Sequence, residues 1–162
     1  MKGLSLIKAL SGDIDTKHVL ITVVGSQRDA YGEENKIELF THGRSYYKNG
    51  VHYLSYQETE VSGLEGATTL LKIYTDHIIL VRMGAVEQRQ EFRLGERCFS
   101  SYITPFGTMD MSMRTTRLTV NRLDDSGWVT RVHIEYELEI DGQWQSANTL
   151  SVTVQGDRKN GH

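Results

Sequence analysis

The stretch HIEYELEID, residues 133–141, alternates between polar and apolar side chains without a break. One parity carries the apolar residues Ile134, Tyr136, Leu138 and Ile140. A period of two is typical of a β-strand with one dry face and one wet face. The stretch therefore predicts a strand whose dry face covers either a packed core or a cavity that holds a ligand.

Other stretches of the chain have a similar β-rich composition and leave little room for helix. They are residues 18–26, 36–48, 51–61, 68–75, 77–84, 88–94, 97–104, 108–120 and 144–154, with 129–140 around the first stretch. Asn49-Gly50 and Asp141-Gly142 are typical of two-residue hairpin turns, because both central residues of a type I′ turn need positive φ. Pro105 favours another tight turn within residues 104–107. The chain is therefore predicted to run as an antiparallel up-and-down meander.

The apolar parity changes across the last predicted hairpin. A two-residue turn at Asp141-Gly142 places Ile140 opposite Gln143, so the apolar residues after the turn should be odd-numbered. They are instead the even-numbered Trp144, Leu150, Val152 and Val154. A bulge or a longer loop is needed to bring both apolar sets to one side.

A second parity change lies within residues 108–120. Met109, Met111 and Met113 are odd-numbered, whereas Leu118 and Val120 are even-numbered. This predicts a bulge near Thr115-Thr116, and bulges let long strands bend around a closed barrel. We therefore predict an all-β fold, a single closed or nearly closed antiparallel barrel of about eight to ten strands with at most one or two short helices.

Length and composition are those of one independent domain. The chain has 162 residues, and its 18 Lys and Arg nearly balance its 21 Asp and Glu, so no global field favours nucleic acid or an anionic membrane. Cys98 is the only cysteine, which excludes an internal disulfide and fits a reducing compartment. Because the start lacks a signal-peptide pattern and no apolar run has membrane length, we expect a cytoplasmic location.

We expect the barrel domain to cover residues 17–156, followed by a flexible tail at 157–162. The segment before it, residues 1–16, has apolar residues at near-helical spacing, namely Leu4, Ile7 and Leu10. Three predicted strands are apolar on both parities, in residues 19–24, 69–73 and 78–81. Their outer faces need a cover, either the N-terminal segment or a second copy of the protein.

Three blocks of the chain resemble the YwiB-like family of small bacterial proteins. The blocks are YLSYQETEVSGLEGATTLLKIY, VRMGAVEQRQEF and YITPFGTMDM. The matching positions are Tyr56, Glu58, Glu60, Gly63, Leu64, Glu65, Gly66, Thr68, Arg82, Gly84, Phe92, Tyr102, Thr104, Pro105 and Gly107. The similarity spans about residues 17–154. It implies a calycin-type, lipocalin-like barrel and implies no activity.

Familiar signatures of catalysis and cofactor binding are absent. There is no P-loop, dinucleotide-binding fingerprint, nucleophile elbow or Cys-x-x-Cys, so we expect no cofactor and no catalytic residue. The six histidines are scattered without metal-ligand spacing, and we interpret each as a surface residue and expect no metal. The arginines between residues 82 and 131, a segment without lysine, are interpreted as partners in ion pairs on the wet faces.

Glu58 and Glu60 are the strongest candidates for chemistry. The preceding hairpin turn would put both on the face of Tyr56, with the two carboxylates about 7 Å apart. If that face is the interior, the pair could bind a polar ligand or perform acid/base chemistry, with Arg82 as charge partner. The alternative is a further bulge that turns both glutamates to water and brings Val61 inside, and this is the outcome we predict.

The leading interpretation of function is a small-molecule-binding barrel without catalytic activity, with an apolar or amphipathic ligand. Its candidate ligand-binding residues are Tyr56, Glu58, Glu60, Arg82, Met109, Met111, Tyr136 and Trp144. The alternative is a structural or regulatory module that acts as a homodimer. A third interpretation is hydrolase-type chemistry at Glu58 and Glu60.

Overall fold

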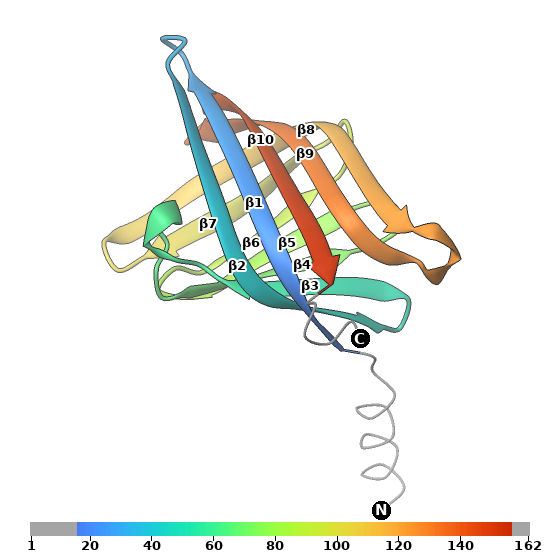
Figure 1. Cartoon of the computed structure of the whole chain (residues 1–162). Coiled ribbons are helices and arrows are strands. Elements are labelled where there is room, and N and C mark those ends of the chain that lie inside the picture. The colour runs from blue at the N-terminus through green and yellow to red at the C-terminus, as the bar shows by residue number, and fades with distance from the viewer. Residues whose placement is uncertain (1–15, 157–162) are drawn as a thin grey trace, which may run out of the picture.

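The computed structural model describes residues 16–156, which form ten β-strands and two single turns of 3-10 helix (Figure 1). The strands are β1 (Lys17–Asp29), β2 (Glu34–Lys48), β3 (Val51–Gln57), β4 (Ala67–Ile73), β5 (Ile78–Gly84), β6 (Gln88–Phe92), β7 (Arg97–Thr104), β8 (Gly107–Leu123), β9 (Trp128–Ile140) and β10 (Gln143–Gly156). The turns are η1 (Glu60–Ser62) and η2 (Asp124–Ser126). Each strand corresponds to one predicted stretch, so the all-β prediction is confirmed.

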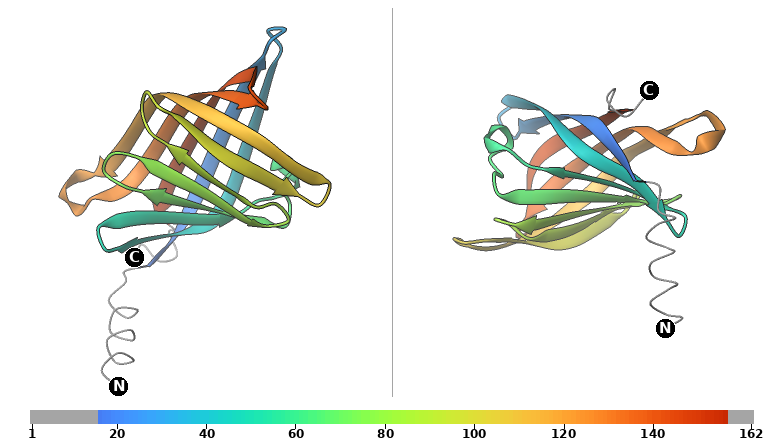
Figure 2. Two further views of the ribbon diagram at one scale, coloured as in Figure 1. Left: turned by 180° about the vertical axis from the view of Figure 1, so that it is seen from behind. Right: turned by 60° about the horizontal axis from the view of Figure 1, so that its bottom comes forward.

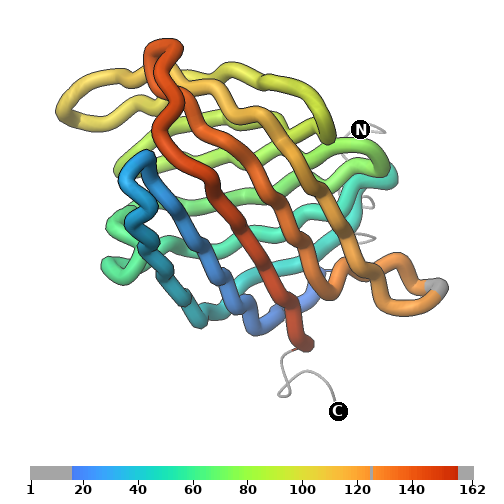
Figure 3. Tube along the Cα trace, turned by 90° about the horizontal axis from the view of Figure 1, so that it is seen from above, coloured from blue at the N-terminus to red at the C-terminus, as the bar shows by residue number. Residues whose placement is uncertain are grey.

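All strands belong to one antiparallel sheet in the order β6-β5-β4-β3-β2-β1-β10-β9-β8-β7, which curls into a barrel (Figure 2). The first and last strands lie side by side and pair from Val19↔Gly156 to Asp29↔Ser146, as the view from above shows (Figure 3). The two edge strands, β6 and β7, meet at one isolated bridge. There Glu87 N–H donates to Ile103 O over 3.0 Å, and Ile103 N–H donates back over 2.9 Å. The barrel is therefore nearly closed.

The predicted hairpin turns have the expected backbone. Asn49 and Gly50 have φ of 53° and 79°, and Lys48 pairs with Val51 across them. Asp141 and Gly142 have φ of 51° and 80°, and Ile140 pairs with Gln143. Both turns therefore need residues that tolerate positive φ, which Asn, Asp and Gly supply.

Both predicted bulges are present. The register of β10 on β9 shifts between Trp144 and Ser146, and that of β8 on β9 shifts between Thr115 and Arg117. A third shift, between Asn121 and Arg122, was not predicted. After the first two shifts the apolar sets meet, because Ile134 pairs with both Leu118 and Leu150.

The prediction that Trp144 lines the interior is wrong. Trp144 lies before the bulge, so it pairs with Glu139 and shares the outer face with that residue. The residue is 41 % exposed, and its indole N–H donates to Glu137 Oε1 over 2.9 Å. The bulge changes the parity of β10 only after Trp144, so this residue stays on the wet side.

The burial of the dry face of β9 decreases along the strand. Val132 and Ile134 are fully buried, whereas Tyr136, Leu138 and Ile140 are only partly buried. The packed half of the interior includes Val19, Ile21, Leu54, Leu71, Ile73, Ile78, Phe92, Val129, Val132, Ile134 and Val152. Each such side chain stabilises the fold by about 2 kcal/mol. The dry face thus covers a solid core at one end of the barrel and a looser interior at the other.

One glycine, in β2, lies where its neighbours β1 and β3 leave no room for a side chain. Gly43 pairs with both Val19 and Tyr56. A Cβ atom there would lie 2.5 Å from the carbonyl oxygen of Ser55 and would overlap the Ile21 side chain. Only glycine fits this position without a backbone shift.

Several expectations concern residues that the structure does not describe. The N-terminal segment with Leu4, Ile7 and Leu10 and the tail at 157–162 lie outside the described residues. On the outer face of the described strands, Ile79 is only 4 % exposed, although Leu20 and Leu70 are partly open. Between residues 16 and 156 no helix is long and apolar enough to cross a membrane.

Candidate functional site

The looser end of the barrel interior contains a group of polar side chains, which we call the interior polar cluster. It consists of Tyr56, Glu58, Thr69, Arg82, Gln88, Gln90 and Ser100. Strand alternation places these residues inside: Tyr56 pairs with Thr69, Thr69 with Arg82, and Arg82 with Gln88. The cluster therefore crosses neighbouring strands from the end of β3 to β7.

Glu58 supplies the carboxylate of the cluster, and its side chain is only 3 % exposed. Its backbone N–H donates to Ala67 O over 2.9 Å, which prolongs the β3–β4 pairing by one residue beyond Gln57. Thr69 Oγ1 donates to Glu58 Oε2 over 2.5 Å, and Arg82 Nε lies 3.9 Å from the same oxygen. A buried carboxylate needs such a hydroxyl and cation, because desolvation otherwise makes its charge costly.

Arg82 connects Glu58 to the rest of the cluster but does not use all its donors. Arg82 Nη1 donates to Gln88 Oε1 over 3.1 Å. Its Nε is buried and has no hydrogen-bond partner in the described part of the chain. The 3.9 Å separation from Glu58 is an electrostatic contact and is too long for a hydrogen bond. The interior thus holds one charged donor that is available to an acceptor.

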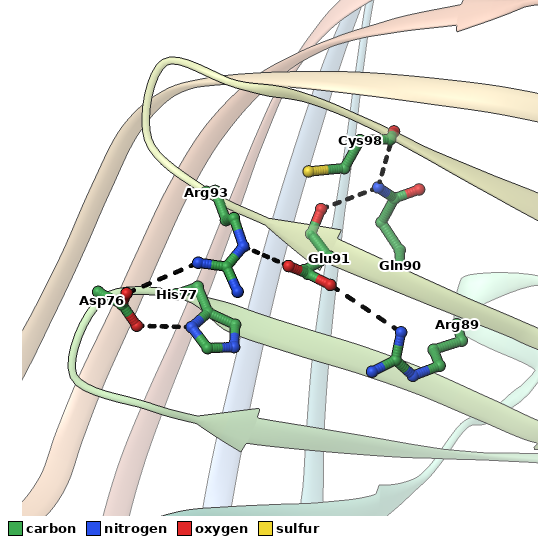
Figure 4. A network of polar contacts seen from close by, with 7 residues as sticks. All are labelled: Asp76, His77, Arg89, Gln90, Glu91, Arg93 and Cys98. Atoms are coloured by element: carbon green, nitrogen blue, oxygen red, sulfur yellow. Dashed lines mark hydrogen bonds and ion pairs between the residues drawn. The ribbon is translucent and has the colours of Figure 1, made fainter.

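From Gln88 the hydrogen bonds continue across the seam between β6 and β7. Gln88 Nε2 donates to Ser100 Oγ over 3.2 Å, and Ser100 Oγ donates to Gln90 Oε1 over 2.7 Å. Gln90 Nε2 in turn donates to the carbonyl oxygens of Cys98 and Glu91, over 3.2 and 2.9 Å (Figure 4). Side chains therefore take the place of a continuous backbone ladder along most of this seam.

Two tyrosines, Tyr56 and Tyr136, lie close to the ion pair of Glu58 and Arg82. Burial, assisted by the Glu58 carboxylate, raises the pKa of the Tyr56 phenol. Burial also raises the pKa of Tyr136, although the nearby Arg82 charge opposes this shift. Both phenols therefore stay neutral at pH 7 and can donate a hydrogen bond.

Five of the predicted ligand-binding residues gather in this region. Tyr56, Glu58 and Arg82 belong to the interior polar cluster, Met111 Sδ accepts from Gln88 Nε2 over 3.7 Å, and Tyr136 lies close enough for Arg82 to influence its pKa. Met109 shares the parity of Met111 but is 39 % exposed near the β7–β8 turn.

Neither expected arrangement of the two glutamates is present. The prediction that both face water is wrong, because Glu58 is buried, and Val61 is 53 % exposed where that alternative placed it inside. The inward alternative fails for Glu60, which is exposed in η1. The strand ends after Gln57, so the parity of β3 does not extend to residue 60.

Thr69, Gln88, Gln90 and Ser100 were missed by the sequence analysis. The two glutamines did leave a signal, because they share the parity of the buried Phe92 in the stretch QRQEF. Polar residues on a dry parity indicate a polar interior. Thr69 and Ser100 left no comparable signal, since small hydroxyl residues are common on either face of a strand.

The interpretation of all histidines as surface residues is wrong for His52, which is fully buried. Its Nδ1 accepts from the N–H of Val129 over 3.2 Å, so Nε2 carries the proton and donates to Ser45 Oγ over 2.5 Å. The rings of Tyr47 and Trp128 pack against it, with centroids 4.3 and 5.3 Å away. His52 therefore has a structural role in the packed half of the barrel.

Ion pairs on the outer face confirm the predicted role of several arginines. Arg93 contacts Glu91 and lies 3.6 Å from Asp76, while Arg89 lies 4.0 Å from the other Glu91 oxygen (Figure 4). The hydrogen bond from Arg93 lowers the pKa of Glu91, and that from His77 lowers the pKa of Asp76. Across the described range, no three His, Cys, Asp or Glu side chains are placed to hold a metal ion.

The outer face of the barrel is hollowed next to the interior polar cluster. A hollow of ≈ 480 Å³ lies between the β5–β6 turn and β7, and Arg82 and Gln88 form part of its lining. Met83 and Ile103 contribute apolar surface to the same hollow. The rest of the lining comes mostly from the outer parity of the strands, including Val81, Arg89 and Ser101, so the hollow lies outside the isolated bridge that closes the barrel.

Comparison with known proteins agrees with the architecture. The model of a domain of unknown function, DUF1934, matches residues 21–152. The uncharacterized beta-barrel protein YwiB of Bacillus subtilis (strain 168) is 26 % identical over 125 residues, which cover 77 % of this chain and 84 % of that protein. The crystal structure of the ywiB protein from Bacillus subtilis gives a TM-score of 0.74 at 23 % identity, over 91 % of this chain and 97 % of that one. The resemblance seen in the sequence is thereby confirmed.

Proposed function

The chain belongs to the DUF1934 family, a family of unknown function, and we propose that its barrel binds a small amphipathic molecule without catalysing a reaction. The observation that carries the proposal is the unpartnered Arg82 Nε inside the barrel. A buried donor on a charged group that lacks an acceptor costs about 1–3 kcal/mol. A ligand that presents an acceptor oxygen to Arg82 would recover this free energy.

The surroundings of Arg82 support an amphipathic ligand. Met111, Leu138 and Ile140 line the same half of the interior and are only partly buried. Methionine adapts to ligands of varied shape. The acceptor end of the ligand would therefore meet Arg82 and the neutral Tyr136 hydroxyl, while its apolar body would cover these side chains.

The positions of the two glutamates argue against hydrolase-type chemistry. Hydrolysis of a glycoside by a carboxylate pair needs both groups on one accessible face. Glu58 lies inside with Thr69 and Arg82, whereas Glu60 lies outside in η1. A cytoplasmic location is part of the proposal and is supported by the single cysteine of the chain, Cys98.

Titration with 1-anilinonaphthalene-8-sulfonate, an amphipathic fluorescent probe with acceptor oxygens, tests the proposal. We expect saturable binding that weakens about tenfold or more in the double variant R82M/E58Q, since one charge-assisted hydrogen bond is lost. The double variant avoids leaving Glu58 buried without its cation. R117M is the matched control, because the Arg117 side chain is 68 % exposed and lies away from the hollow that Arg82 lines. Equal affinity in the double variant and in wild type would refute the proposal.

A further inference from the structure

Strand β2 has an open edge over more than half its length. It pairs with β1 from Glu34 to Ser45, but its pairing with β3 covers only Gly43–Lys48. In Figures 1 and 2 the β1–β2 hairpin projects beyond the rim of the barrel, and no strand lies along the outer side of this part of β2. Residues 34–42 thus have no strand partner on that side within residues 16–156.

The pairing with β1 determines which backbone groups point to the open edge. At the hairpin end, Asp29 N–H donates to Glu33 O over 3.0 Å. Hydrogen-bonded and non-hydrogen-bonded pairs alternate along an antiparallel ladder, so the even-numbered residues of β2 direct their N–H and C=O groups away from β1. The open groups are those of Lys36, Glu38 and Phe40. In the described chain they bond to no other strand or loop.

An open edge of this length usually carries protection such as proline, a bulge or charged side chains, and of these this edge has the charges of Glu34, Lys36 and Glu38. Residues 34–42 contain no proline, and the β1–β2 register runs without a shift. Ile37 and Phe40 are 40 % and 65 % exposed. We propose that this edge pairs antiparallel with the same edge of a second copy of the chain, around a two-fold axis at Ile37.

The charges favour this register over its two neighbours. Because only even-numbered residues offer open groups, the axis must relate even-numbered residues to one another. An axis at Ile37 places Lys36 opposite the partner's Glu38, and by symmetry Glu38 opposite the partner's Lys36. An axis at Lys36 or at Glu38 would place like charges opposite each other, which is destabilising.

A hollow beside the open edge adds to the charge complementarity. It has a volume of ≈ 400 Å³ and lies between β2 and η1. Phe40 and Val61 supply its apolar surface, and its carboxylates are those of Glu38, Glu60 and Glu65. The partner's Lys36, placed opposite Glu38, would extend its ammonium group toward these carboxylates. Glu60 would then act at the subunit interface and not in ligand binding.

Charge exchange tests this dimer, with sedimentation velocity as the measurement. K36E alone and E38K alone should each raise the dimer dissociation constant about tenfold or more, because two ion pairs become two repulsions. The double variant K36E/E38K should restore the wild-type constant. An equimolar mixture of the two single variants should also dimerise, since each then meets its opposite charge.

R44E is the matched control for these variants. Arg44 is an exposed residue of the same strand and undergoes the same change of charge as in K36E, but it pairs with Ser55 of β3. Its dissociation constant should equal that of wild type, and circular dichroism should confirm that every variant is folded. A wild-type protein that stays monomeric at hundreds of micromolar, or a double variant as weak as the single ones, overturns the proposal.

Discussion

His52 Nδ1 accepts a hydrogen bond from the backbone N–H of Val129 over 3.2 Å, although 77 residues separate them. The bond joins β3 to β9, which lie four places apart in the sheet order, with β2, β1 and β10 between them. A protonated imidazole could not accept it. The packed half of the barrel therefore depends on a neutral histidine.

Acid should weaken the fold through this residue. Burial, with the nearby charges of Arg122 and Lys17, lowers the pKa of His52 from 6.5 to about 4. Between these pH values the unfolded chain binds more protons than the folded one, so the free energy of unfolding falls as pH drops from 6.5 to about 4. The loss contributed by His52 should reach about 3 kcal/mol.

Urea unfolding measured from pH 7 to pH 4 would detect this loss. H52Q should flatten the pH dependence over that interval, because it removes the titrating group. H18Q is the matched control, because it makes the same substitution at an exposed histidine. An identical slope in H52Q and wild type would contradict the structural role of His52.

Replacement of Glu58 should cost far more stability than replacement of Glu60. E58Q leaves the Arg82 charge without its carboxylate inside the barrel, so we expect a loss of about 2–4 kcal/mol in the free energy of unfolding. E60Q changes an exposed side chain and should cost under about 0.5 kcal/mol. Chemical denaturation compares the two. Similar small values for both would mean that Glu58 is not paired in the interior.

G43A should lower the melting temperature strongly, because the new Cβ would overlap Ile21 and the carbonyl oxygen of Ser55. We expect a decrease of about 5–10 °C, which corresponds to about 2–3 kcal/mol for a chain of this size. G25A is the control, because its Cβ would meet Ile37 Cγ1 at an ordinary 3.5 Å. Differential scanning calorimetry gives both values, and equal shifts would contradict the close packing at Gly43.

Loss of the Gln90 side chain should loosen the seam between β6 and β7. In Q90A the carbonyl of Cys98 loses its donor and Ser100 loses its acceptor. The Cys98 thiol, whose pKa is raised by burial, should then react several-fold faster with iodoacetamide. Q143A, at an exposed position of β10, should react at the wild-type rate. Unchanged reactivity in Q90A would show that the seam does not depend on this side chain.

The fold was largely predictable because it depends on local patterns. Alternation predicts the strands, Asn49-Gly50 and Asp141-Gly142 predict two turns, and the parity conflict near Thr115 predicts the bulge that lies there. The third bulge, at Asn121, was not predicted, although Leu123 breaks the even parity of Leu118 and Val120 on the same strand. A single apolar residue at the end of a strand is too short a pattern to reveal a register shift.

The candidate site was only partly predictable, because the side of the sheet on which a side chain lies depends on where the strand ends or bulges. Trp144 was misplaced since the bulge follows it, and Glu60 was misplaced since β3 ends at Gln57. The burial of His52 depends on Trp128, which comes from a distant strand. Such contacts are set by the closed barrel and are not encoded in the neighbouring residues.

The break in the covalent chain and the break in the hydrogen-bond ladder lie at different places around the barrel. Where the described chain begins and ends, β1 and β10 form one of the longest ladders, from Val19↔Gly156 to Asp29↔Ser146. Where the ladder is interrupted, between β6 and β7, the backbone itself is continuous. Each neighbouring pair of strands around the barrel is thus held together. The covalent backbone joins β6 to β7, and hydrogen bonds join β1 to β10. A permuted chain cut near Gly95 and joined through its old ends would bring the two breaks together, and its barrel should open first along that line.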